Sequence, residues 1–228
     1  MLTARPTGVN DGMTVAAALR RLNGLLPLKA NQSRLASSLR KLHIAILRSY
    51  AHCGAPPSRA ELERHAGIDD LAAALQRLAD ADLIVLTRDK AAIAGAYPFT
   101  SELRPYRVTL FGHEARAMCA LDALSIAPMF DTLTQVQARC HVHGTPVEVH
   151  LDGSHVLATL PAQPYVGIHW QSTSGCAAQS LCMDMVFLRD QATAAAWRQS
   201  DPENIDCFDL ADAIAFGAGF FRPLLRDG

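Results

Sequence analysis

Cys119 and Asp122 stand three residues apart in the apolar segment "AMCALDAL", residues 117–124. On a helix or a tight turn, residues at i and i+3 share one face, so the thiol and the carboxyl group would lie side by side. A carboxylate beside a thiol can take the thiol proton and later give it to another atom. An ordinary buried cysteine next to a local aspartate would produce the same short pattern.

A second thiol, Cys182, lies in the apolar run "SLCMDMVFL", residues 180–188. Its alternation predicts a strand that places Cys182 and Asp184 on one face and Met183 and Met185 on the other. A cysteine in a buried strand usually serves packing, so this run alone does not indicate chemistry.

The segment "RCHVHG" gives Cys140 and His143 a C-x-x-H spacing that could hold zinc. A structural zinc site needs about four ligands, and the others would have to come from Cys176, Cys182 or isolated histidines. Because no second paired motif follows, the favoured interpretation is a buried Cys140 that begins a β-hairpin.

A cysteine hydrolase is another hypothesis for Cys119. Such an enzyme needs a histidine base near the thiol, and His113 and His169 are the candidates. No glycine-rich turn that could bind an oxyanion flanks Cys119, so this hypothesis is disfavoured.

The composition is that of a globular protein with a large core. Half of the 228 residues are hydrophobic, 19% are charged, and the net charge of −1 gives no reason to expect wholesale binding to nucleic acid or to a membrane surface. The start "MLTARPTGVNDGM" has no apolar signal region, and no window approaches the roughly 18 apolar residues of a membrane helix. We therefore expect a cytoplasmic protein, in which the six cysteines form no disulfide framework.

The first part of the chain predicts helices followed by a hairpin. Residues 14–26 and 33–51 have helical spacing, and Ser58 with Glu61 has the form of a capping box for a helix closed by Gly67. A further helix follows Asp69 or Asp70, and two short strands flank a polar turn at 87–90. This order over 41–96 is typical of a winged helix, so we predict a helical, winged-helix-like domain over residues 1–96.

A winged helix suggests a DNA-binding regulator whose cysteines sense metal. The charge of residues 58–90 argues against DNA binding, because a reading helix must neutralise phosphates. This segment contains fewer basic than acidic residues: five are basic (Arg59, Arg64, Arg77, Arg88, Lys90) and seven are acidic (Glu61, Glu63, Asp69, Asp70, Asp80, Asp82, Asp89).

Residues 97–228 predict a second domain of α+β class with a mostly antiparallel sheet and flanking helices. Residues 106–112 are strand-like, 117–130 predict a short helix or turn stopped by Pro128, and the alternation after it predicts an antiparallel meander. Two more strands follow at 164–170 and 180–188, and helices are expected at 191–199 and 207–225.

Taken together, these segments resemble the organomercurial (alkylmercury) lyase family. The resemblance rests on a C-x-x-D segment at Cys119 and Asp122, a cysteine that opens a hairpin at Cys140, a further cysteine at Cys182, and the A-F-G-x-G helix at residues 215–219. It covers roughly residues 40–225 and is strongest from 97 onward. Met183 and Asp184 stand where the family has a second cysteine and a histidine.

The resemblance implies that Cys119 and Cys182 bind mercury as thiolates while Asp122 carries a proton to the leaving carbon. Mercury(II) is soft and prefers thiolate, and a second thiolate makes the mercury-bound carbon more basic. Asp122 is then a further possible contact for mercury. Cys140 matches a structural cysteine of the family.

The same resemblance implies no cofactor, because mercury is substrate and product. It implies an organomercurial and cellular thiols as small-molecule partners, a mercuric reductase as acceptor of Hg(II), a winged-helix-like part that binds no DNA, and no membrane. The alternatives are a relative that only binds soft metal ions, one that cleaves another organometal such as an organotin, and the winged-helix regulator.

Overall fold

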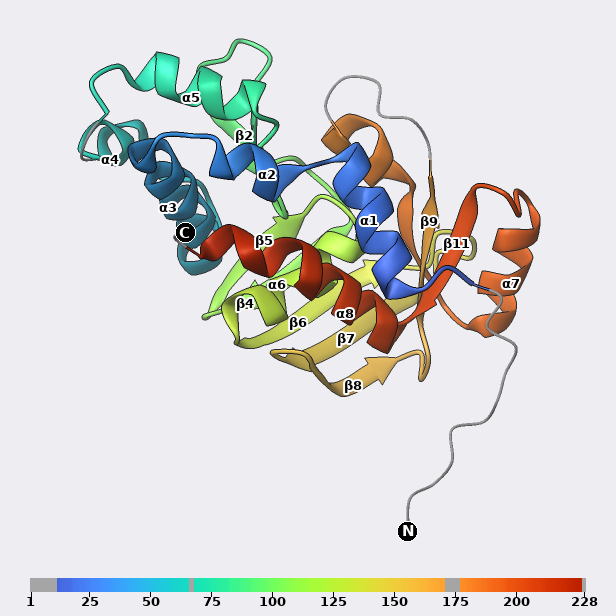
Figure 1. The fold of residues 1–228 in the computed structure, drawn as a ribbon. Helices are drawn as coiled ribbons and strands as arrows, with labels where there is room; N and C mark the ends of the chain where they lie inside the picture. Colours follow the sequence, from blue (N-terminus) through green and yellow to red (C-terminus); the bar gives the residue numbers. More distant parts are fainter. Residues whose placement is uncertain (1–11, 66–67, 171–176, 227–228) are drawn as a thin grey trace.

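The computed structural model describes residues 12–65, 68–170 and 177–226, and Figure 1 traces their path. Its helices and antiparallel sheets confirm the predicted α+β class. In this described part, no helix combines the length and the apolar character needed to cross a membrane. The α-helices are α1 (Val15–Leu25), α2 (Leu28–Ser33), α3 (Ser37–Cys53), α4 (Arg59–Glu63), α5 (Leu71–Asp80), α6 (Ala120–Phe130), α7 (Gln191–Gln199) and α8 (Leu210–Phe221).

Short 3₁₀ helices and two sheets complete the fold. The 3₁₀ helices are η1 (Ala177–Gln179), η2 (Leu181–Asp184) and η3 (Arg222–Leu225). The strands are β1 (Ile84–Leu86), β2 (Ile93–Ala96), β3 (Phe99–Thr100), β4 (Tyr106–Leu110), β5 (His113–Ala117), β6 (Leu133–Arg139), β7 (Pro146–Asp152), β8 (His155–Leu160), β9 (Tyr165–His169), β10 (Met185–Leu188) and β11 (Ile205–Asp209).

The larger sheet has the order β1-β2-β3-β5-β4-β6-β7-β8, and the smaller one has the order β10-β9-β11. Each neighbouring pair in both sheets is antiparallel, which confirms the predicted meander of β6, β7 and β8. Figure 1 shows α6 between the large sheet and α8, with α1 alongside α8.

Helix α6 is the central element of the core, since ten of its eleven residues are buried. It approaches α8 closely at Gly217, where a Cβ atom would collide with Oγ of Ser125. A glycine at this position therefore lets two buried helices pack together, although it costs helix propensity.

The helix caps expected in the first part are present. Ser58 and Glu61 form the capping box of α4, and the side chain of Asp70 accepts the N–H of Ala73 at 3.0 Å at the start of α5. Gly67, the predicted end of the helix that begins after Ser58, lies outside the described residues.

Sheet and core both continue across the boundary expected near residue 97. Strand β2 pairs with β3 through Gly95↔Thr100 and Ala96↔Phe99, and one hydrophobic cluster includes residues from both sides. The winged-helix comparison and the division into domains 1–96 and 97–228 stay predictions.

Pro128 does not stop α6, which corrects the sequence-based expectation. The helix continues to Phe130 and ends at Asp131, whose left-handed backbone (φ 52°) lets its N–H bond the carbonyl of Ala127. Proline in the last turn removes one hydrogen bond, and the burial of the whole helix outweighs that loss.

Two predicted boundaries in the second part are also wrong. Residues 181–184 form η2 instead of strand, because β9 ends at His169 and pairing with β10 begins only at Met185↔Ile168. The expected helix from residue 207 begins at Leu210, because residues 205–209 pair with β9 as β11.

Candidate active site

Cys119 lies two residues after the end of β5 and is the N-cap residue of α6. Its extended backbone (φ −149°, ψ −179°) lets Sγ accept the N–H of Asp122 at 3.3 Å. An N-cap side chain normally accepts such an N–H through oxygen, and here a thiol takes that place. The end of β5 and the first turn of α6 thus fix Cys119 and Asp122 on one side of the helix terminus.

Asp122 is a buried carboxyl group, with 2% of the residue exposed. Among the described residues, its Oδ2 atom has no hydrogen-bond partner. Burial raises the pKa of Asp122 to about 7, although the side-chain and backbone hydrogen bonds with Cys119 act in the opposite direction. A carboxyl group that titrates near neutral pH can both take and give a proton.

Cys182 reaches the same place from η2, far along the chain. One ligand atom from each of Cys119, Asp122 and Cys182 lies within 4.8 Å of the others, and all three residues are buried. Two sulfurs that bridge one soft metal sit roughly 4–5 Å apart, since each metal–sulfur bond is about 2.3 Å or slightly longer. The spacing of the cluster is therefore compatible with one soft metal ion bound by both sulfurs.

The Cys119 thiol is held in its protonated form. Burial is the main cause that raises its pKa well above the ordinary value, and the side chains of Cys182 and Asp122 raise it further. The N–H of Asp122 lowers this pKa by a smaller amount. A nearby proton acceptor is therefore needed to produce a thiolate, and Asp122 is adjacent.

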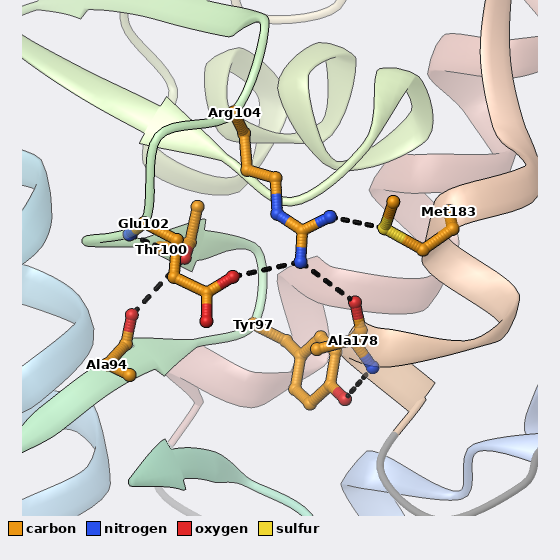
Figure 2. Close-up of polar contacts among 7 residues, drawn as sticks. All are labelled: Ala94, Tyr97, Thr100, Glu102, Arg104, Ala178 and Met183. Atoms are coloured by element: carbon orange, nitrogen blue, oxygen red, sulfur yellow. Dashed lines mark hydrogen bonds and ion pairs between the residues drawn. The ribbon is translucent and has the colours of Figure 1, made fainter. Parts of the chain in front are cut away.

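A hydrogen-bonded clamp holds the segment that carries Cys182, as Figure 2 shows. The Arg104 guanidinium donates to Glu102 at 2.9 Å, to the carbonyl of Ala178 at 3.4 Å and to the sulfur of Met183. From the core side, Tyr97 Oη accepts the N–H of Ala178 at 2.8 Å. We call the contacts of Arg104 and Tyr97 with residues 178–183 the η-clamp.

Tyr106, on β4, lies near the cluster of Cys119, Asp122 and Cys182. Its hydroxyl donates to the carbonyl of Met185 at 3.3 Å. Burial, followed by the nearby Cys119 and Asp122, raises the pKa of the phenol, so it stays protonated as a donor. Sequence reasoning missed Tyr106 and Arg104, because neither belongs to a motif and their roles depend on contacts with residues about 80 positions away.

The other sequence candidates lie elsewhere. Cys140 is buried in the β6–β7 hairpin, where its N–H bonds the carbonyl of Thr145 at 2.8 Å. In the described ranges, neither Cys140 nor His143 belongs to a group of ligands that could hold a metal. The zinc hypothesis thus has no support in this part of the chain, and its remaining candidate, Cys176, lies outside the described residues.

The histidines of the hydrolase hypothesis do not join Cys119. His113 is exposed at the start of β5, whereas Cys119 follows the end of that strand. His169 contacts Asp201 through Nε2 at 3.2 Å. The described site therefore pairs the thiols with a carboxyl group instead of an imidazole.

Several known proteins are similar to this chain. A family model described as "MerB: Alkylmercury lyase" matches residues 99–222. Curated proteins named alkylmercury lyase are similar, one from Bacillus cereus (22% identical over 50% of this chain and 51% of that protein) and one from Streptomyces lividans (24% identical over 55% and 58%). The chain thus spans about half the length of the curated relatives it matches.

A solved structure is similar over a longer stretch. The crystal structure of the mercury-bound form of MerB2 matches with a TM-score of 0.70 and 20% identity, over 86% of this chain and 98% of that one. At this identity, the likeness shows the fold alone.

Proposed function

Because the chain belongs to the alkylmercury lyase family, we propose that it cleaves the carbon–mercury bond of organomercurials, releasing a hydrocarbon and mercury(II). The observation that carries this proposal is the buried cluster of Cys119, Cys182 and Asp122 within 4.8 Å. Two soft donors and one proton carrier are the minimum set for this reaction.

The proposed reaction begins with loss of a thiol proton. Asp122 in its ionised form takes a proton from a thiol, and the thiolate bonds to mercury of R–Hg⁺. A second thiol then bonds to mercury as a thiolate, and its proton is lost to solvent, since Asp122 already holds the first. With both sulfurs bound, electron density on mercury rises and the carbon becomes basic enough to accept a proton.

Protonated Asp122 then gives its proton to that carbon, and the carbon–mercury bond breaks. The balance is R–Hg⁺ plus two thiols giving R–H, mercury bound to two thiolates, and one proton. Burial of all three side chains supports the step, because exclusion of water keeps the proton transfer directed at carbon. Residues of this chain supply each group, so the proposal includes no cofactor.

The partners follow from this chemistry and are part of the proposal. The substrate is a hydrophobic organomercury cation delivered by cellular thiols. The product is Hg(II) held by sulfur, so its acceptor must offer competing thiols, either a small molecule or a mercuric reductase. A protein that only binds soft metal ions, or that cleaves an organotin, would contain the same three side chains.

Three variants test the proposal by hydrocarbon release from methylmercury and phenylmercury salts. Cys119→Ser, Asp122→Ala and Cys182→Ser should each lose at least ~100-fold in turnover, because each removes a thiolate or the proton carrier. Cys207→Ser is the matched control and should keep full activity, since its thiol points to the carbonyl of Ala194 at 3.4 Å, outside the cluster.

Two outcomes would argue against the proposal. Full turnover by Cys182→Ser would contradict the use of two thiolates. Tight Hg(II) binding by the unaltered protein without methane or benzene would favour a metal-binding function.

A further inference from the structure

A third sulfur lies in the buried cluster. Sδ of Met185 is 3.7 Å from Sγ of Cys119, and only 2% of Met185 is exposed. The thioether comes from the first residue of β10, directly after η2 and Cys182. The Met185 sulfur therefore contacts Cys119, which itself clusters with Cys182 and Asp122.

The backbone around Met185 is fixed on two sides. Its carbonyl accepts the Tyr106 hydroxyl at 3.3 Å, and its register partner in β9 is Ile168. Met185 and Phe187 face the main core, whereas Val186 and Leu188 face a smaller cluster with Ala194. The alternation of β10 therefore directs the Met185 side chain toward Cys119.

The separation of the two sulfurs fits a shared metal. Two sulfurs on opposite sides of one ion would be roughly 4.6 Å apart for bonds of about 2.3 Å. The observed 3.7 Å is shorter, which matches two donors on a bent or three-coordinate centre. Thioether sulfur is a soft ligand of the kind that selects soft metal ions.

We propose that Met185 is a third sulfur ligand, whose thioether bonds to the mercury held by Cys119 and Cys182. This inference rests on the proposed function and adds to it a residue that selects for soft metals and retains the Hg(II) product. The thioether carries no proton and no charge, so it donates an electron pair to mercury without altering the proton balance of the reaction. Its presence makes the product three-coordinate in sulfur.

Selenium labelling provides the direct test. The full chain is produced with selenomethionine in place of its six methionines, loaded with one equivalent of Hg(II), and measured by X-ray absorption at the mercury edge. We expect one selenium neighbour in addition to two sulfurs. A mercury shell with two sulfurs and no selenium would overturn the inference, and this outcome requires no variant to fold.

Two leucine variants show which methionine gives the selenium signal. Met185→Leu should abolish it, because leucine has similar volume but no donor atom, and such exchanges usually cost less than about 1.5 kcal/mol. Met183→Leu is the matched control and should keep the signal, since Met183 is 52% exposed and its sulfur is bonded by Arg104. Loss of selenium in the Met183 variant alone would contradict the assignment.

The failure of this inference and the failure of the proposed function are distinguishable. If hydrocarbon is released but mercury has no selenium neighbour, Met185 is a packing residue and the lyase proposal stands. If selenium is bound but no hydrocarbon appears, Met185 is a ligand in a protein that only binds metal.

Discussion

Asp122 is a carboxyl group held where its ionised form is disfavoured. Burial raises its pKa from an ordinary 3.8 to about 7, and Oδ2 has no hydrogen-bond partner among the described residues. Such a group weakens the folded state at neutral pH, which is a common feature of sites selected for chemistry. In the proposed reaction, the same environment lets Asp122 take a thiol proton and give it to carbon.

The cost of burying Asp122 predicts an unusual dependence of stability on pH. Between pH ~4 and pH ~7 the unfolded chain has released this proton while the folded chain keeps it, so the free energy of unfolding falls as pH rises. Asp122→Asn removes the titration. We expect the variant to be more stable than the unaltered protein at pH 8 by roughly 2–4 kcal/mol, and nearly equal to it at pH 4.

Urea unfolding of both proteins at the two pH values measures this difference. Burial lowers the pKa of His43 to about 4. The free energy of unfolding therefore rises with pH between about 4 and 6.5, which is opposite to the effect of Asp122. Both proteins contain His43, so its contribution cancels in the difference. An equal difference at pH 4 and pH 8 would show that Asp122 titrates normally in the folded protein.

At the residue scale, the sequence indicated the local pair and missed the long-range contacts. Cys119 and Asp122 are three residues apart, and a helix start is enough to bring them together. Met185 could not be recognised, because strand alternation over 180–188 placed it opposite Cys182. The 3₁₀ turn of η2 breaks that alternation, so both sulfurs reach the same cluster.

At the level of secondary structure, the site lies where two junctions between elements come together. One is the junction of β5 and α6, whose geometry is set by the N-cap at Cys119. The other is the junction of η2 and β10, where β10 pairs with β9 from Met185 onward and the η-clamp contacts residues 178–183 (Figure 2). The position of Cys182 therefore depends on contacts outside its own element.

Removal of the η-clamp should lower activity without removing a reacting group. We expect Arg104→Met to reduce kcat/KM for a phenylmercury salt on the order of tenfold, because a small displacement of Cys182 misaligns the second thiolate. Steady-state kinetics with quantified benzene measures this effect.

Arg107→Met is the matched control for that experiment. Arg107 also lies near this end of the large sheet, but it contacts Gln137 at 3.0 Å and Glu114 at 4.0 Å, with no contact to η2. Its variant should keep full activity. Equal losses in both variants would indicate a general effect of charge and contradict a specific role for Arg104.

At the scale of the whole molecule, one sheet and one core connect the cluster to the rest of the chain. The large sheet runs from the β1–β2 hairpin to β8, and α6 is enclosed between that sheet and α8. Local patterns predicted most helices and strands, since amphipathic spacing and caps act within short segments. They could not predict the approach of η2 to α6, which depends on how both sheets pack around α6.

The resemblance to the family predicted which distant cysteines should meet, which local patterns could not predict. The order of Cys119, Asp122, Cys140 and Cys182 suggested which thiols should meet, and the fold places Cys119 and Cys182 together. Cys140 lies in its hairpin and takes no part in the cluster. The positions at which the chain departs from the family, Met183 and Asp184, lie at the outer side of η2, where Met183 is bonded by Arg104.

In the proposed reaction, two thiolates and Asp122 convert R–Hg⁺ to R–H with a proton that Asp122 takes from a thiol. The most direct measurement is mass spectrometry of the benzene released from a phenylmercury salt by protein exchanged into D₂O. We expect benzene with one deuterium, in an amount equal to the mercury that the protein binds. Bound mercury without any benzene, or benzene released equally by the Cys182→Ser variant, would contradict it.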